Sequence, residues 1–439
     1  MNSKQGVQLQ NSSTPSEAKR LQPGSALNKI YFITMIAGGL TLATALNGCG
    51  SGGFESLETT VDVHSNQTSY GSESNPPPAP SPTPPPNPTP QPGPTSSPAE
   101  TLSPDSSFPA PPFPSAYTAG SLRVCKSGCP YQLPSQALAA ATAGSVVELE
   151  AGDYADCIAI AADNITVRGI GGYVRLSGVC GPATYFNRIA TKPAAHNTTL
   201  EFFELSACDS PSNGIAACIA HHGVNLTLRW FFVHDTSAGF GTNSLDDTIN
   251  IESSRFDHIG AVLADGRHRA AQVSSWKSAE LFIRGTYITR STHEGNEIWS
   301  RSMKTTVDCS LIANLGESDT IPLLAQFGGV LTVTNSVLAR SGTVTQRQFI
   351  SIGNTSGWTN SVTLTGNTFI DDTSGGSVIY VTGSMPINIS NNLVIGPSRL
   401  LYNDSTYKGV NNQQLASRPS SLGPYPNLPK PGPCTTAWR

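Results

Sequence analysis

Residues 331–338 read Leu-Thr-Val-Thr-Asn-Ser-Val-Leu, and residues 362–369 repeat the pattern as Val-Thr-Leu-Thr-Gly-Asn-Thr-Phe. Each copy begins with an apolar–polar–apolar strand and reaches a second apolar position after a short turn. The strand occurs nine times, with third positions 23 to 33 residues apart: Ile165-Thr166-Val167, Thr198-Thr199-Leu200, Leu226-Thr227-Leu228, Ile249-Asn250-Ile251, Leu281-Phe282-Ile283, Thr305-Thr306-Val307, Leu331-Thr332-Val333, Val362-Thr363-Leu364 and Ile387-Asn388-Ile389. This spacing is typical of a solenoid whose turns stack on one another.

Each repeat carries two further apolar positions. The second position is at Phe232-Val233, Phe256, Tyr287-Ile288, Leu311-Ile312, Val337-Leu338, Phe369 and Leu393-Val394. The third is at Val262-Leu263, Ile298-Trp299, Leu323-Leu324, Phe349-Ile350 and Val378-Ile379-Tyr380. Three short strands per turn predict an all-β, single-stranded right-handed parallel β-helix. A β-sandwich or propeller is the alternative, but sandwich strands would be separated by hairpin turns at intervals of about 8–12 residues.

Asparagines recur at the turns of the predicted solenoid. One set lies between the first and second apolar positions and predicts a stacked, hydrogen-bonded ladder: Asn335, Asn367 and Asn392. A second set falls in Asn-x-Thr sequons: Asn164, Asn197 and Asn225. These asparagines open strands, which argues against glycosylation.

Four segments follow from the composition. Residues 1–49 resemble a lipoprotein signal peptide, residues 50–117 form a Pro/Ser/Gly-rich disordered linker, residues 118–402 form the β-helix domain, and residues 403–439 form an extended, proline-rich tail. The linker has few large apolar residues and cannot bury a core. Within the domain, the alanine-rich stretch from Pro134 to Ala143 predicts a capping helix that ends at Gly144 and covers the first turn.

The N-terminal segment is typical of an export signal. Basic residues precede an apolar stretch from Ile30 to Leu46, which is too short for a comfortable membrane span. The stretch ends in Leu46-Asn47-Gly48-Cys49, which resembles the bacterial lipobox, in which the cysteine is lipidated. The resemblance implies a lipid anchor on Cys49 in the outer membrane, because Gly50 rather than Asp follows it. An uncleaved signal anchor is the alternative.

Eight further cysteines form an even set, and export implies an oxidising compartment. We expect four disulfides: Cys125–Cys129, Cys157–Cys180, Cys208–Cys218 and Cys309–Cys434. The alternative for the Cys-x3-Cys pair at Cys125 and Cys129 is zinc binding, but the chain has no matching second Cys/His pair.

The opening of the solenoid resembles a known family. Leu149-x-Ala-Gly-x-Tyr154 and the run from Ile165 to Gly172 are similar to bacterial right-handed β-helix proteins of the pectin-lyase-like superfamily. The resemblance covers roughly residues 122–396 and implies the fold. Its members include pectate and alginate lyases, polygalacturonases, epimerases, phage tailspikes and adhesins, so the fold by itself does not identify an activity.

One subgroup is similar at Asn-Leu-Thr-Leu-Arg (225–229) and Leu-Phe-Ile-Arg-Gly (281–285). Its functional face carries three motifs rich in His, Lys, Arg, Glu and Asp. This chain instead has Ala271-Gln272-Val273-Ser274, then Gly295-Asn296-x-x-Trp299-Ser300-Arg301, then Pro322-Leu323-Leu324. Ser300 and Arg301 alone match, which puts the subgroup's activity in doubt for this chain.

Polar residues follow the second apolar position in several turns. They read His234-Asp235, Asp257-His258, Thr289-Arg290, Ala313-Asn314, Ala339-Arg340 and Asp371-Asp372. Because stacked turns lie about 4.8 Å apart, equivalent residues form columns. A uronate lyase needs a base and a cation that stabilises developing charge. The predicted catalytic set is His258, Arg290, Arg301 and Lys304, and the alternative is a solvated polar ladder.

The window from Arg255 to Lys304 has an excess of Lys and Arg over Asp and Glu, whereas the whole chain has a net charge of −4. We therefore expect an anionic glycan to bind there. The predicted substrate-binding residues are Asp235, Asp257, Arg267, Arg269, Trp276, His293 and Trp299. The alternatives are ordinary loop polarity for Arg267 and Arg269, and core packing for Trp299.

Two further chemistries have weaker support. Hydrolysis of the polygalacturonase type needs paired carboxylates together with a Gly-His-Gly element, and the chain offers the pair Asp246-Asp247 without that element. No cofactor is expected, although Ca²⁺ could bind through Asp246, Asp247 or Asp257. Nucleic acid is not an expected partner, because the chain has no broad basic face and no recognised motif.

These patterns predict a monomeric, outer-membrane-anchored β-helix lipoprotein that engages an acidic polysaccharide. In the first interpretation it is a non-catalytic binding or surface protein on a degenerate lyase-like scaffold. In the second it is an active polysaccharide lyase or glycoside hydrolase.

Overall fold

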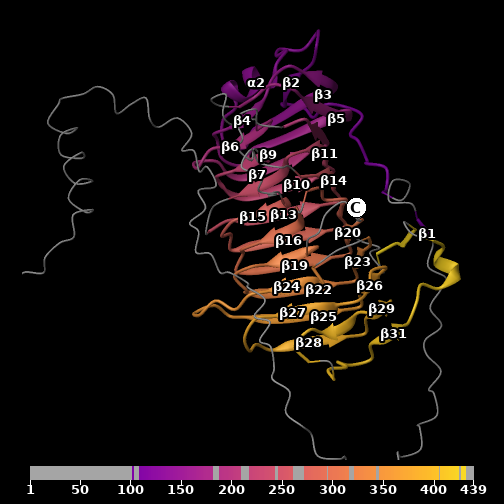
Figure 1. Ribbon diagram of the computed structural model, residues 1–439. Helices are drawn as coiled ribbons and strands as arrows, with labels where there is room; N and C mark the ends of the chain where they lie inside the picture. Colours follow the sequence, from indigo (N-terminus) through magenta and orange to yellow (C-terminus); the bar gives the residue numbers. More distant parts are fainter. Residues whose placement is uncertain are drawn as a thin grey trace, which may run out of the picture. The chain divides into compact units, whose positions relative to one another are not determined.

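The structure is a computed structural model that describes residues 108–180, 187–208, 217–242, 246–260, 271–293, 295–315, 321–342, 346–404, 406–424 and 427–431, with the backbone of 101–102. Its long sheets are built from parallel strands that pair from one turn to the next. Figure 1 shows these turns stacked from the indigo to the yellow end of the domain. The fold is a right-handed parallel β-helix, as the repeats predict.

The strands lie on three faces, because the 20-stranded sheet bends at the long strands β3 and β5, which contribute to two faces. The first face contains β2 (Leu122–Val124), β3 (Val146–Tyr154), β5 (Thr166–Leu176), β7 (His196–Glu201), β10 (Val224–Arg229), β13 (Thr248–Glu252), β16 (Glu280–Arg284), β19 (Lys304–Asp308), β22 (Val330–Thr334), β25 (Ser361–Thr365) and β28 (Ile387–Ser390). The second face continues β3 and β5 with β8 (Phe203–Ser206), β11 (Phe232–Thr236), β14 (Arg255–Ile259), β17 (Tyr287–Thr289), β20 (Leu311–Asn314), β23 (Val337–Arg340), β26 (Thr368–Asp371), β29 (Leu393–Ile395) and β31 (Gln413–Leu415).

The third face is the 10-stranded sheet. It contains β4 (Ile158–Ile160), β6 (Ile189–Thr191), β9 (Ala217–His221), β12 (Ala238–Thr242), β15 (Ala271–Ser275), β18 (Asn296–Ser300), β21 (Leu323–Ala325), β24 (Gln348–Ile352), β27 (Ser377–Val381) and β30 (Arg399–Leu401). In the turn that follows β14, the third-face strand is β15. The sequence pattern places the third apolar position of this repeat at Val262-Leu263, which lies outside the described residues.

The core is a set of apolar columns that run through the turns. Ile249 pairs with Leu226 and Leu281 in the neighbouring strands, and all three side chains are fully buried. Each such side chain contributes about 1.5–3 kcal/mol on burial. The apolar–polar–apolar pattern therefore sets the register, because a slip by one residue would expose a whole column.

A hydrogen-bonded ladder runs through the turns between the first and second faces. The backbone N–H of Ser336 donates to Asn367 Oδ1 at 2.9 Å, and that of Asn367 donates to Asn392 Oδ1 at 2.9 Å. The predicted ladder residues Asn367 and Asn392 are confirmed, but Asn335 is not a member. It occupies the preceding turn position at φ 50°, a left-handed conformation that asparagine tolerates, and Ser336 takes the ladder position.

A second asparagine ladder lies on the surface. Asn197 Nδ2 donates to Asn164 Oδ1 at 2.9 Å, and Asn225 Nδ2 donates to Asn197 Oδ1 at 2.8 Å. All three residues have φ between 53° and 62°. The sequons thus coincide with positions at which asparagine side chains bond one another across turns.

A column of alternating charge, which was not among the sequence-based predictions, crosses the first face. Successive strands place acidic and basic residues in register: Glu148, Arg168, Glu201, Arg229, Glu252, Arg284 and Asp308. Arg229 shows the pattern, because it lies 2.7 Å from Glu252 and 3.3 Å from Glu201. Each interior member of this charge column therefore has opposite charges on both sides.

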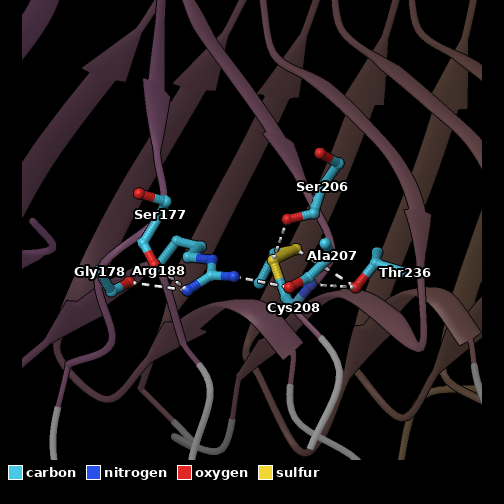
Figure 2. Close-up of a disulfide and its surroundings, with 8 residues drawn as sticks. Ser177, Gly178, Arg188, Ser206, Ala207, Cys208 and Thr236 are labelled. Atoms are coloured by element: carbon cyan, nitrogen blue, oxygen red, sulfur yellow. Dashed lines mark hydrogen bonds between the residues drawn. A yellow bond between two sulfur atoms is a disulfide. The ribbon is translucent and has the colours of Figure 1, made fainter. Parts of the chain in front are cut away.

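Three predicted disulfides are present: Cys125–Cys129, Cys157–Cys180 and Cys208–Cys218. Cys309 is also disulfide-bonded, while its predicted partner Cys434 lies outside the described residues. Figure 2 shows the surroundings of Cys208. There the buried Arg188 donates to the carbonyl oxygens of Ser177, in its own turn, and of Ala207, in the next turn, each at 2.6 Å, and so joins two turns.

Segments outside the solenoid pack on its ends and on its second face. The capping helix α2 (Pro134–Ala140) lies at the N-terminal turn, as predicted. Strand β1 (Thr101–Leu102) pairs with β32 (Leu428–Pro429), and η1 (Ser420–Leu422) lies between β31 and β32. Phe108, from the predicted linker, packs edge-on against Tyr287 with the ring centroids 5.3 Å apart. Within the described residues no helix has the length and hydropathy to cross a membrane, and Cys49 lies outside them.

Candidate functional site

The predicted polar column forms at the end of the second face. Asp235, His258 and Arg290 take equivalent places in three successive turns. All three adopt the left-handed conformation, with φ of 47°, 54° and 57°. Non-glycine residues rarely adopt this conformation, and here it recurs at the same corner of the solenoid, since Ala207 in the preceding turn has φ 50°.

Asp235 lies between two histidines. His234 Nδ1 is 2.7 Å from Asp235 Oδ2, and His258 Nδ1 is 2.7 Å from Asp235 Oδ1. The hydrogen bond from His234 is the main reason that the pKa of Asp235 lies below its ordinary value, and the bond from His258 acts in the same direction. The imidazole of His258 is 45% exposed, so a carboxylate orients a ring that solvent can reach.

Asp257 and Arg290 form a separate ion pair next to this cluster. Arg290 Nε donates to Asp257 Oδ1 at 2.8 Å, and Arg255 Nη2 donates to Asp257 Oδ2 at 2.8 Å. Thr289 Oγ1 adds a third bond at 2.7 Å. Burial alone would raise the pKa of Asp257, but these bonds and the two positive charges lower it. Both carboxylate oxygens of Asp257 therefore accept hydrogen bonds within the protein, and we assign this residue a structural role.

The four predicted catalytic residues do not form one cluster, which corrects the sequence-based expectation. Arg290 precedes β18 and Arg301 follows it, so the strand separates them by about 16 Å at 3.3 Å per residue. Lys304 begins β19 on the first face, where its Nζ lies 2.6 Å from Glu280 Oε1. These residues are separated because each strand of the third face runs from one corner of the turn to the next. Residues that are close in sequence can therefore lie at opposite ends of that face.

Arg301 belongs to an aromatic cluster instead. Its guanidinium carbon lies 3.4 Å from the ring centroid of Trp276, 4.5 Å from that of Trp299 and 4.9 Å from that of Phe327. Gln326 Oε1 accepts from Arg301 Nε at 2.6 Å and from Trp299 Nε1 at 3.0 Å. Trp299 is half-buried and its neighbour Ile298 is fully buried, so Ile298 rather than Trp299 fills the core.

More aromatic residues continue this cluster along the third face. The ring of Trp358 lies 6.4 Å from that of Phe327, and the rings of Tyr380 and Tyr402 are 5.2 Å apart. Tyr380 stands in the same column as Trp299, with Leu324 and Ser351 between them. We call the set the aromatic stripe: Trp276, Trp299, Phe327, Trp358, Tyr380 and Tyr402.

The charges beside the aromatic stripe are mostly positive, with the exposed Asp404, two residues after Tyr402, as a carboxylate at its C-terminal end. Lys277, Arg301 and Arg399 lie along it, and Arg399 packs over the Tyr402 ring at 5.1 Å. In the third-face strands from β15 to β30 the described residues include one carboxylate, Glu297, and it is fully buried. An acidic ligand would therefore meet cations and aromatic rings there.

The other predicted residues contribute little to a common site. His293 is exposed in the turn before β18, and Arg267 and Arg269 lie outside the described residues. Asp247 is buried and accepts from Thr242 Oγ1 at 2.8 Å and from the Asn225 N–H at 2.9 Å. Asp246 is exposed, and no group of three His, Cys, Asp or Glu residues within the described ranges is arranged to hold a metal ion.

The chain has distant matches among solved structures. No protein-family model and no curated protein matches the chain. Among solved structures it is similar to an alginate lyase from Paenibacillus sp. str. FPU-7, with 16% identity, a TM-score of 0.38, and 63% of this chain and 96% of that chain covered. It is also similar to a pectin methylesterase from Aspergillus niger, with 12% identity, a TM-score of 0.25, and coverage of 74% and 96%. Likenesses at this level do not identify an activity.

Proposed function

We propose that the protein binds an acidic polysaccharide along the aromatic stripe, as a non-catalytic, lipid-anchored surface protein. The observation that carries the proposal is the contact of the Arg301 guanidinium with two indole rings, those of Trp276 and Trp299. A planar guanidinium suits recognition of a carboxylate, and aromatic faces suit the apolar faces of sugar rings. The surroundings carry cations and no exposed carboxylate among the described residues of these strands, which favours a uronate over a neutral glycan.

The separation of the predicted catalytic residues favours binding over catalysis. In a polysaccharide lyase, the general base and the group that stabilises the developing charge must both reach the same sugar unit. His258 and Arg301 lie at opposite ends of the third-face strands, and Lys304 is paired with Glu280. The six residues of the aromatic stripe include no His, Asp, Glu or Lys, and its two tyrosines carry the hydroxyl groups that could act as a base.

One observation favours a second candidate function, an active polysaccharide lyase or glycoside hydrolase. The Asp235–His258 pair resembles the carboxylate–imidazole arrangement that orients a general base. In this alternative His258 would remove the proton next to the uronate carboxylate, and Arg290, in the next turn, would supply the positive charge.

The two functions are separated by one experiment on the purified full-length protein. Alginate, pectate and glycosaminoglycans are incubated with it while unsaturated product is followed by ultraviolet absorbance and new reducing ends are counted. The proposal predicts retention of the protein by an acidic glycan without product. Product formation that His258→Ala abolishes would establish the lyase instead.

The anchor is a separate part of the proposal. Cys49 would carry the lipid, and the part of the predicted linker that precedes β1, residues 50–100, would form the tether, at about 3 Å per residue where extended. Cys49→Ser should move the protein from the membrane fraction to the soluble fraction. Equal membrane retention of both forms would support the uncleaved signal anchor.

A further inference from the structure

Gln272 and Glu297 form a buried polar pair in a column of the third face that becomes apolar in the turns that follow. They stand opposite each other on β15 and β18, because their neighbours Val273 and Ile298 are paired in register. Both side chains are fully buried. In the following turns the equivalent places are held by Pro322, Phe349 and Val378, and the last two belong to the main hydrophobic core.

Three acceptor oxygens of this pair have no hydrogen bond of normal geometry, although the hydroxyl and N–H of Ser291 favour the Glu297 carboxylate. Gln272 Nε2 donates to the carbonyl oxygen of Thr289 at 2.8 Å, which fixes the orientation of the amide. Gln272 Oε1 and both carboxylate oxygens of Glu297 then have no hydrogen-bond partner. They are three of the eight such buried side-chain atoms in the described part of the chain. Orphaned acceptors that gather at one place require a proton, a cation or water.

No cation among the described residues compensates a charge on Glu297. The neighbouring strands β15, β20 and β21 contain no titratable residue, and β17 contains only Tyr287, whose ring packs against Phe108. Arg290 precedes the strand but is bound to Asp257, and His293 is exposed. Burial raises the pKa of Glu297 to about 8, and polar groups of its own backbone and of Ser291 oppose this rise only in part.

We propose that Glu297 is a neutral carboxylic acid at neutral pH and that its O–H donates to Gln272 Oε1. One proton then satisfies two of the three orphaned oxygens, and no charge is buried. The bond links β15, which leads into Trp276, to β18, which carries Trp299. Ionisation in alkali would remove the donor and place a charge among core residues, so this link between turns is sensitive to pH.

The sign of the effect on stability follows from linkage. The unfolded carboxyl titrates near 4.5, and the folded one keeps its proton to about pH 8. Between these values the native state binds more protons, so stability falls as the pH rises. Release of one proton on unfolding changes the unfolding equilibrium constant about ten-fold per pH unit.

The test compares wild type, Glu297→Gln and Glu252→Gln as full-length proteins by denaturant unfolding between pH 5 and pH 9. The amide introduced by E297Q can donate the same bond and cannot titrate. Relative to that of E297Q, the unfolding equilibrium constant of wild type should rise about ten-fold per pH unit up to about pH 8. E252Q, which alters a partly exposed carboxylate of the charge column, should follow wild type over this range.

A second measurement keeps the proposal testable if E297Q does not fold. At pH 6.5 carboxyl groups with ordinary pKa values are ionised, so the wild-type infrared spectrum should keep a protonated-carboxyl C=O band that disappears above about pH 8. Absence of this band at pH 6.5 would overturn the proposal. Parallel stability profiles of wild type and E297Q, or stability that depends on which alkali cation is present, would also overturn it.

Discussion

The guanidinium carbon of Arg301 lies 3.4 Å from the ring centroid of Trp276, and this contact joins two successive turns of the solenoid. Arg301 follows β18, and Trp276 follows β15. The contact places a cation and an aromatic face at one point of the outer surface. The proposed polysaccharide site begins at this point and continues along the aromatic stripe.

Arg301→Lys tests whether the planar guanidinium matters beyond its charge. We expect about ten-fold weaker binding of an acidic polysaccharide, or about 1.4 kcal/mol, because an ammonium can neither stack in the same way nor form two parallel bonds to a carboxylate. Affinity is measured by calorimetric titration. Arg123→Lys is the matched control, since Arg123 also stacks on an aromatic ring, that of Tyr117, at the N-terminal end. An equal loss of affinity in the Arg301→Lys and Arg123→Lys variants would contradict a specific role for Arg301.

Arg229→Met tests the charge column of the first face. Glu201 and Glu252 would then face each other across the uncharged side chain, and we expect a loss of about 1 kcal/mol in the free energy of unfolding, because Arg229 is partly exposed. The loss should shrink at high salt, where charges are screened. Urea unfolding at low and high salt measures both effects. A loss that does not change with salt would indicate side-chain packing rather than charge.

Asp371→Asn tests the buried pair near the C-terminal turns. Asp371 lies 3.0 Å from Arg340, and both side chains are almost completely buried. Removal of the carboxylate leaves a buried guanidinium without its counter-charge, which costs about 3–5 kcal/mol. Unfolding by denaturant at neutral pH provides the measurement, and a cost below about 1 kcal/mol would contradict this account of the pair.

The same carboxyl predicts how stability responds to acid. Burial would raise the pKa of Asp371, but the charge of Arg340 and hydrogen bonds from Ser398 and Thr373 lower it below the ordinary 3.8. A lowered folded pKa gives stability that is present above the unfolded value and is lost as the pH falls through the folded value. The gap in stability between wild type and D371N should therefore narrow below about pH 4. A constant gap from pH 7 to pH 2 would show that this carboxyl does not ionise as described.

The disulfides should differ in their contributions. Cys157–Cys180 spans 23 residues and Cys125–Cys129 spans 4. Loop-closure entropy predicts losses of about 3 kcal/mol for the double alanine variant of the first pair and about 2 kcal/mol for that of the second. Denaturant unfolding of the two double variants shows which of them loses more free energy of unfolding. The reverse order would show that native-state contacts outweigh chain entropy.

The repeated strand pattern was sufficient to predict the fold, because one register fits all the buried columns. Ile249 and its partners in neighbouring turns had to face inward together. The ladder was harder to predict. Asparagine suits both the left-handed turn position, as at Asn335, and the next position, as at Asn367, so the residue type alone does not separate them.

The candidate site was predicted only in part. Adjacent turns place Asp235 next to His258, as the column argument required. The same argument could not show that Arg301 lies at the far end of a strand from Arg290, because the corner positions depend on loop lengths. The charge column was visible in the sequence as Glu201, Arg229 and Glu252, but its alternation becomes apparent once the strands are aligned in register.

The central claim is that the aromatic stripe binds an acidic polysaccharide, and affinity electrophoresis tests it most directly. Wild type and the double variant Trp299→Ala/Arg301→Ala are run through gels that contain alginate, pectate or a neutral glucan. The account predicts that at least one acidic gel retards wild type, that the double variant migrates freely, and that the neutral gel retards neither. Equal retardation of both proteins, or free migration of wild type in every acidic gel, would contradict it.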